Sequence, residues 1–115
     1  MQRQHRMANI TCRIRKYRKS AQLSQLELAR LVGLKSQGTL CEIEAGTKRP
    51  SARVAFACEI VFATPTRELF PSLYARSTRT VRKAAARLQG TLGEKRPAAR
   101  EHLADVVRRL SHSGV

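Results

Sequence analysis

The side chains best suited to chemistry lie in one short stretch, LVGLKSQGTLCEIEAGTKRPS, residues 31–51. It contains two carboxylates, Glu42 and Glu44, followed by the basic residues Lys48 and Arg49. Carboxylates accept hydrogen bonds and basic side chains bind anions, so this chemistry is that of recognition. The chain has no glycine-rich phosphate loop and no spaced set of Ser, His and Asp side chains. His102 and Asp105 are three residues apart but have no nucleophile, so we expect no enzyme and no cofactor.

The chain is strongly basic, with a formal net charge of +15 from 23 Lys and Arg and 8 Asp and Glu. Residues 1–20 hold seven bases and no acid, residues 21–74 six bases and five acids, and residues 75–115 ten bases and three acids. Such a charge attracts polyanions, nucleic acid first and an anionic membrane second. The pattern predicts a nearly neutral folded module whose basic flanks add nonspecific attraction to phosphates. For residues 1–8 we favour a solvated tail.

No apolar run approaches the roughly 20 residues of a membrane span, and no apolar stretch follows the N-terminal arginines as in a signal peptide. We therefore expect no membrane partner and a cytoplasmic location, on the nucleoid if the source is bacterial. Cys12, Cys41 and Cys58 form no C-x-x-C pair, and their odd number argues against a disulfide framework. We interpret them as free thiols that pack as small hydrophobic groups, and we expect no metal site.

Apolar spacing and capping residues predict the helices that position these side chains. A first helix over 10–19 is followed by a second that starts at Ser24, where S-x-x-E forms a capping box, and ends at Gly33. A third begins at Ser36 or Gln37 and stops at Gly46. The core of these helices must be aliphatic, because aromatic residues make up only 4% of the chain.

Two more short helices are predicted before the composition changes. Ser51 caps a helix over 52–62, and Pro65 is expected at the first position of a brief helix that ends near Phe70. Pro71 is then expected to close the compact part of the chain.

Beyond Tyr74, two amphipathic segments are predicted. One covers residues 78–89, the other begins at Pro97, and Gly90 and Gly93 interrupt the chain between them. Isolated helices of this length are marginal in water. Three alternatives are open: the segments pair with each other, pair with a second chain, or stay frayed until they bind.

Three stretches, "LSQLELARLVGL", "TLCEIEAGTKRPS" and "TRELF", occur in this order and closely resemble the phage-repressor-like, XRE-type helix-turn-helix family. The resemblance covers residues 10–70, about half of the chain. It implies an all-α fold, a five-helix repressor-like bundle, with a basic and partly helical C-terminal extension. It also implies double-stranded DNA as partner, with the third helix, about 37–45, in the major groove.

The resemblance also implies roles for individual side chains. The positions that usually face bases or flanking phosphates are Gln37, Gly38, Thr39, Cys41 and Glu42. Phosphate contacts are expected from Gln25 at the start of the second helix, where local amides and the positive helix end assist, and from Lys35, Lys48 and Arg49. Alternatives stay open for two of these residues, since Gln37 could cap its helix instead of binding adenine, and Cys41 could be a half-buried filler.

The chain departs from the family pattern in the turn before the third helix. It has one more residue than usual between Gly33 and Ile43, within Lys35–Gly38, and Gly38 lacks a side chain where many members present one that reads a base. We therefore expect a longer turn, and the register of residues 35–38 on the third helix is open by one position.

The two carboxylates receive different interpretations. Glu44 matches the family position whose acid pairs with an arginine of the first helix, which here is Arg18, so we expect a structural ion pair. Glu42 could accept a hydrogen bond from cytosine N4 in the groove. Alternatively, it points to solvent or pairs with Lys35 or Arg49.

These observations predict three parts: a basic tail over 1–9, a DNA-binding domain over 10–74, and a basic extension over 75–115 that is a candidate for helix formation and dimerisation. The favoured function is sequence-specific DNA binding by a homodimeric transcriptional regulator. The alternative is an antitoxin or an accessory protein of a mobile element, which acts mainly through an acidic protein partner.

Overall fold

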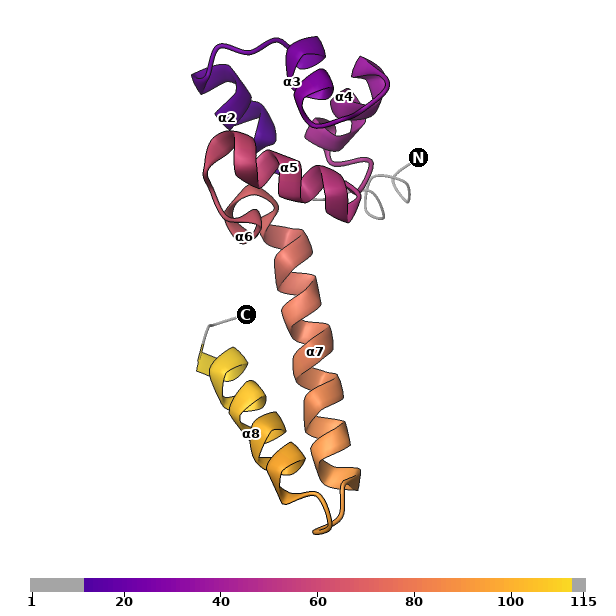
Figure 1. Cartoon of the computed structure of the whole chain (residues 1–115), viewed down its shortest axis with the longest axis vertical. Helices are drawn as coiled ribbons and strands as arrows, with labels where there is room; N and C mark the ends of the chain where they lie inside the picture. The colour runs from indigo at the N-terminus through magenta and orange to yellow at the C-terminus, as the bar shows by residue number, and fades with distance from the viewer. Residues whose placement is uncertain (1–11, 113–115) are drawn as a thin grey trace. The chain divides into compact units, whose positions relative to one another are not determined.

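The computed structural model describes residues 12–112, and these residues are helical apart from turns and short connections. The helices are α2 (Ile14–Ser20), α3 (Gln25–Leu31), α4 (Gln37–Ala45), α5 (Ala52–Phe62), α6 (Thr66–Leu69), α7 (Pro71–Thr91) and α8 (Pro97–His112) (Figure 1). They fall into two compact units, with the division between Tyr74 and Ala75. The predicted all-α class is confirmed, and α2 to α6 form the five-helix bundle.

Serine side chains set the start of three consecutive helices. The hydroxyls of Ser24, Ser36 and Ser51 accept hydrogen bonds from the backbone N–H three residues later, at 3.0, 3.2 and 3.2 Å. At Ser24 the capping box is complete, because the carboxylate of Glu27 accepts from the Ser24 N–H at 2.8 Å. These caps satisfy backbone donors that the first turn of a helix leaves without partners. The predicted starts of α3, α4 and α5 are therefore confirmed.

Two glycines end helices in the left-handed region of backbone space. Gly33 follows α3 with φ of 81°, and Gly46 follows α4 with φ of 83°. A side chain at such φ values meets its own backbone, so glycine is favoured there. After Gly33 the chain turns back, and the Leu34 N–H donates to the Ala29 carbonyl at 2.8 Å. The turn between α3 and α4 thus covers residues 32–36.

The core of the N-terminal unit is almost entirely aliphatic, as predicted. Its fully enclosed side chains come from every helix of the bundle, and Phe70 is the one aromatic residue among them. The buried residues are Ile14, Leu28, Ala29, Val32, Leu40, Ile43, Val54, Ala55, Cys58, Leu69 and Phe70. The rings of Tyr17 and Phe62 pack beside this core with centroids 5.8 Å apart.

The first helix was predicted over 10–19, but in the structure α2 begins only at Ile14. Cys12 and Arg13 precede α2, while residues 10 and 11 lie outside the described part of the chain. The Arg13 N–H donates to the Leu69 carbonyl at 2.9 Å and so joins the entry of α2 to the end of α6. A tertiary hydrogen bond thus replaces the helical one at this position.

The expected role of Pro65 was also wrong by one position. Pro65 has an extended ψ of 147° and caps α6 from outside, so the helix begins at Thr66. The Glu59 carboxylate accepts from the Thr66 N–H at 3.1 Å and from its hydroxyl at 2.6 Å. Because these hydrogen bonds lower the pKa of Glu59, the carboxylate is held in its charged form at the start of α6.

Pro71 opens a helix and does not close the compact part of the chain. It occupies the first position of α7, where the missing N–H costs nothing because that group has no intrahelical partner. Gly90 lies inside α7, so only Gly93 falls in the interruption before α8. The predicted segment 78–89 therefore lies in the C-terminal part of a helix of 21 residues.

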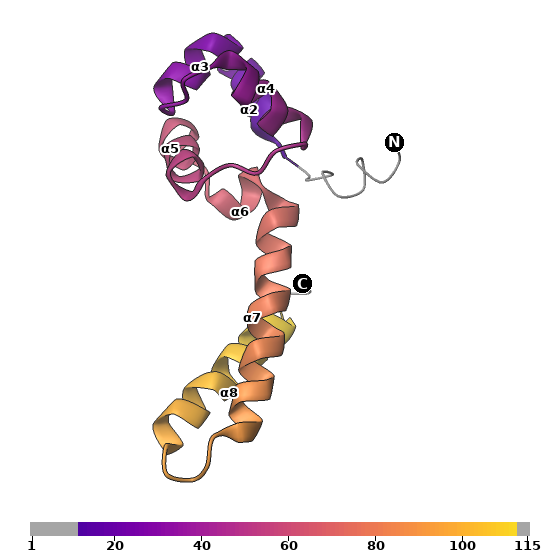
Figure 2. The same ribbon diagram turned by 90° about the vertical axis from the view of Figure 1, so that its right-hand side faces the viewer.

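Within the C-terminal unit, α7 is followed by a short turn, and α8 then runs in the opposite direction (Figures 1 and 2). Both predicted segments are helical in the structure. The start of α8 at Pro97 is confirmed.

Candidate nucleic-acid interface

The helix α4 presents one face to the core and the other to solvent. Leu40, Ile43 and Glu44 are buried, whereas Gln37, Gly38, Cys41, Glu42 and Ala45 are exposed. With Ser36 as N-cap, Gln37 and Gly38 occupy the first two helical positions. This geometry defines the register that the longer turn had left open, and it aligns five exposed side-chain positions along one side of α4.

Thr39 differs from the other predicted contact residues. It is half-buried, and its hydroxyl lies 3.0 Å from the hydroxyl of Ser36, whose oxygen also accepts from the Thr39 N–H. The hydroxyl of Thr39 therefore already takes part in the capping of α4. Ala45, in contrast, is exposed beside the predicted contact positions, and no polar signal in the sequence singled it out.

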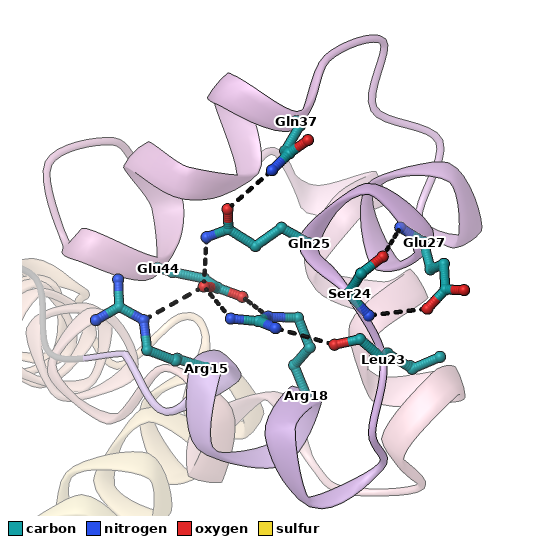
Figure 3. Close-up of polar contacts among 8 residues, drawn as sticks. All are labelled: Arg15, Arg18, Leu23, Ser24, Gln25, Glu27, Gln37 and Glu44. Carbon is teal, nitrogen blue, oxygen red and sulfur yellow. Dashed lines mark hydrogen bonds and ion pairs between the residues drawn. The ribbon is translucent and has the colours of Figure 1, made fainter.

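Glu44 lies at the centre of a polar cluster that connects three helices (Figure 3). Its side chain is fully buried and forms an ion pair with Arg18, in which Nε donates to Oε2 at 2.6 Å and Nη2 to Oε1 at 3.2 Å. Arg18 also donates to the Leu23 carbonyl at 2.9 Å. This is the pair that the family resemblance implied, and it joins α4 to α2 and to the entry of α3.

The ionisation of Glu44 depends on these donors. Burial by itself would raise the pKa of its carboxyl, because a charged group loses solvation inside a protein. Hydrogen bonds from Arg18, Gln25 and Arg15, together with the charge of Arg18, outweigh burial and lower the pKa below its ordinary value. The carboxylate thus stays charged near neutral pH.

Arg15 is a member of this cluster that sequence reasoning missed. Its Nε lies 3.4 Å from Oε1 of Glu44, and half of its side chain is exposed. The available signal was its position one helical turn before Arg18, which places both arginines on the same side of α2.

Gln25 and Gln37 continue the cluster toward the exposed face of α4. The Gln25 amide donates to Oε1 of Glu44 at 3.0 Å, and its carbonyl oxygen accepts from the Gln37 amide at 3.3 Å. The side chain of Gln25 is half-buried and already has two protein partners. One amide hydrogen of Gln25 remains for an external acceptor, because the group has two donors.

The basic residues predicted to contact phosphates lie at both ends of α4. Lys35 is in the turn before the helix, and Lys48 and Arg49 are in the loop after it, all three exposed. This second loop begins at Gly46, and the N–H and hydroxyl of Thr47 both donate to the Glu42 carbonyl, at 3.0 and 3.2 Å. These hydrogen bonds connect the basic loop to the last turn of α4.

Glu42 is exposed on α4, between Gly38 and Ala45 on the same face. In the part of the chain that the structure describes, its carboxylate forms no ion pair with Lys35 or Arg49. The charge of Glu42 is therefore available to an external donor.

The cysteines are free thiols in three different environments. Cys58 is buried, Cys12 is half-buried and Cys41 is exposed on α4. Burial raises the pKa of Cys58 to about 12, so this thiol stays protonated and packs as a hydrophobic group. Among residues 12–112, no group of three or more His, Cys, Asp and Glu side chains is placed to hold a metal ion.

The bundle, the turn between α3 and α4, and the exposed face of α4 define a helix-turn-helix domain. Residues 14–69 match the protein-family model described as helix-turn-helix. Residues 14–69 therefore form a domain of the phage-repressor-like, XRE-type helix-turn-helix family, which consists of DNA-binding transcription regulators. Comparisons with curated proteins and with solved structures gave no significant match. None of the helices described here is both long enough and apolar enough to span a membrane.

Proposed function

We propose that the chain binds a specific sequence in double-stranded DNA, with α4 in the major groove, and regulates transcription by this binding. One observation carries the proposal: the exposed amide of Gln37 is connected through Gln25 to the buried ion pair of Glu44 and Arg18. A side chain held by such a chain of hydrogen bonds loses less freedom when it meets a base, so less binding energy is spent on ordering it.

The proposed roles follow from donor and acceptor chemistry. Gln37 keeps its carbonyl oxygen and one amide hydrogen free of Gln25, which matches the N6 donor and N7 acceptor of adenine in the major groove. Glu42 would accept a hydrogen bond from the N4 amino group of cytosine. Gly38 and Cys41 lie between Gln37 and Glu42, and their small size allows a close approach of α4 to base edges.

The remaining predicted residues are assigned to the DNA backbone. Lys35 would bind phosphate at one end of α4, and Lys48 and Arg49 at the other, so the positive charge flanks the carboxylate of Glu42 on both sides. Thr39 and the remaining amide hydrogen of Gln25 complete these contacts. The chain acts by binding and not by catalysis, and we place it in the cytoplasm, on a bacterial nucleoid.

The proposal is tested by selecting binding sites from random duplexes with the full-length protein near physiological salt. The wild type should recover a motif that contains an adenine at one position. Gln37→Ala should lose the preference there, with about 1–3 kcal/mol less discrimination, because only the amide reads that base. Gln22→Gly is the matched control, since Gln22 is an exposed glutamine outside α4 whose φ of 60° suits glycine. Recovery of no motif by the wild type would refute the proposal.

Lys48→Ala is expected to weaken binding to all duplexes by a similar factor, because a phosphate contact carries no information about sequence. The slope of the logarithm of the binding constant against the logarithm of salt concentration should flatten by about one unit, for one fewer released counterion. Fluorescence anisotropy at several salt concentrations measures both. Lys48→Arg keeps the charge and should keep the slope; a change of base preference in Lys48→Ala would contradict the assignment.

A second candidate function is binding to a protein partner through the same domain, and one feature of α5 favours it. Phe56 and Ile60 lie one turn apart on the exposed side of α5 and are 62% and 80% exposed. Exposed apolar pairs of this kind often mark contact surfaces. Copurification of a partner that Phe56→Ser and Ile60→Ser abolish, with DNA affinity that is only nonspecific, would favour this function.

A further inference from the structure

The polar cluster around Glu44 determines which way two glutamine amides point. A charged carboxylate can only accept hydrogen bonds, so Gln25 must turn its amide nitrogen toward Glu44, as it does at 3.0 Å. The carbonyl oxygen of Gln25 can also only accept, so Gln37 must direct its own amide nitrogen inward, and it does so at 3.3 Å. The buried ion pair of Glu44 and Arg18 thus sets the orientation of Gln37 in two steps (Figure 3).

This orientation decides which groups of Gln37 remain for an external partner. Gln37 is exposed at the first position of α4, and Gln25 uses only one hydrogen of its amide nitrogen. The carbonyl oxygen and the second amide hydrogen remain. If the amide turned by half a rotation, its oxygen would face the oxygen of Gln25, and two acceptors would meet without a hydrogen between them. Gln37 therefore cannot exchange its oxygen and nitrogen as a glutamine in solvent does.

The orientation of Gln37 has a consequence for the chemistry of the adenine that it is proposed to bind. In that contact the carbonyl oxygen accepts from N6 of adenine, and the amide hydrogen donates to N7. N6 has two hydrogens, and the base pair with thymine uses one of them. A single methyl group on N6 must replace the other hydrogen while the base stays paired. The methyl group then lies on the edge of the major groove beside N7, where the oxygen of Gln37 would accept its hydrogen bond.

We infer that methylation of this adenine at N6 blocks binding, so that the protein distinguishes unmethylated from methylated copies of its DNA site; this inference rests on the proposed function. The methyl group removes the donor that the Gln37 oxygen needs and contacts that oxygen, and an acceptor left without a partner in a contact weakens binding. A glutamine without an inner partner can swing away from the methyl group. Gln37 can do so only by breaking its hydrogen bond to Gln25.

The test uses the full-length protein and duplexes that carry the selected motif, with binding measured by fluorescence anisotropy near physiological salt. The adenine to be modified is the one for which Gln37→Ala loses its preference. N6-methyladenine at this position should weaken binding by the wild type about tenfold to a hundredfold, as the loss of a bidentate base contact does. N6-methyladenine in the flanking duplex is the matched control and should leave the affinity unchanged. Equal binding of the methylated and unmethylated sites by the wild type would overturn the inference.

Gln25→Ala tests whether the orientation of Gln37 is what excludes the methylated base. This variant keeps Gln37 but removes its inner partner, so the amide can swing away from the methyl group. The ratio of the dissociation constants for methylated and unmethylated sites should therefore be about threefold or more smaller than in the wild type, since no hydrogen bond to residue 25 is broken. A lost phosphate contact or lower stability changes both constants alike and cancels in the ratio. An equal ratio in the two proteins would overturn the role of Gln25.

The selection of duplexes separates a failure of this inference from a failure of the proposed function. If the wild type recovers no motif, both are refuted. If it recovers a motif in which Gln37→Ala changes no adenine, or one whose methylation leaves binding unchanged, this inference is refuted and specific binding to DNA stands.

Discussion

Arg18→Met is expected to lower the free energy of unfolding by about 3–5 kcal/mol, because it leaves the buried carboxylate of Glu44 without its main partner. Arg18 supplies two of the hydrogen bonds to this carboxylate and the nearest positive charge. Gln25 and Arg15 remain, but one is uncharged and the other is half-exposed. Urea unfolding followed by circular dichroism measures the change.

Arg15→Met is the matched control, since it removes an arginine one turn away that also contacts Glu44. Its side chain is 50% exposed and its Nε is 3.4 Å from the carboxylate, so the loss should stay below about 1 kcal/mol. If the two variants lose equal stability, Glu44 does not depend on Arg18. If Arg18→Met is as stable as the wild type, the ion pair does not contribute to the free energy of unfolding.

Acid provides a second readout of the same ion pair. The pKa of Glu44 is lower in the folded protein than its ordinary value of 4.5, so folding favours the charged form. Its contribution to stability is therefore complete above that value and is lost as the pH falls through the folded pKa. The wild type should lose more stability than Arg18→Met over this acidic range, because the variant no longer has the charge that lowers the pKa.

Leu40→Ala is expected to cost about 2–5 kcal/mol of stability, because Leu40 is the fully buried side chain that fixes α4 to the core. Removal of its branched end leaves a cavity among aliphatic side chains that relax only in part. The midpoint of urea unfolding should fall while its slope stays constant, as expected when the native fold is kept.

Cys41→Ala is the control for Leu40→Ala, since Cys41 is the next residue but lies on the exposed face of α4. Its stability should lie within about 0.5 kcal/mol of the wild type. A cost below about 1 kcal/mol for Leu40→Ala would contradict the burial of this face. The two neighbours thus separate the face of α4 that supports the fold from the face that we propose reads DNA.

Most element boundaries of the N-terminal unit could be predicted, because they depend on neighbours in sequence. The hydroxyls of Ser24, Ser36 and Ser51 reach backbone groups only three residues away, and glycine is favoured after α3 and α4 for its own backbone freedom. The family match was likewise visible in short motifs. For the site, the sequence pointed to the exposed residues of α4 and to the partner of Glu44, but not to Arg15 or to the bridge made by Gln25.

The helix starts that could not be predicted depend on residues that lie farther along the chain. Arg13, whose N–H donates to the Leu69 carbonyl, is the N-cap of α2, and α6 starts at Thr66, whose N–H and hydroxyl donate to the Glu59 carboxylate. Pro71 can start or stop a helix, depending on whether the residues after it are helical, and only the length of α7 shows that it starts one.

By itself, then, the sequence determined the family motifs, the starts of α3, α4 and α5 and the face of α4 that lies outward, because caps and apolar spacing involve neighbours within about one turn. Only the tertiary structure showed that Gln25 and Arg15 also bind Glu44 and that Gln25 binds Gln37, because these partners lie 12 to 29 residues apart along the chain. A charge can be buried only where folding brings donors together, and no local pattern specifies their distances. The same holds for Val81 and Leu88 of α7: their spacing can be read from the sequence, but their exposure depends on the fold.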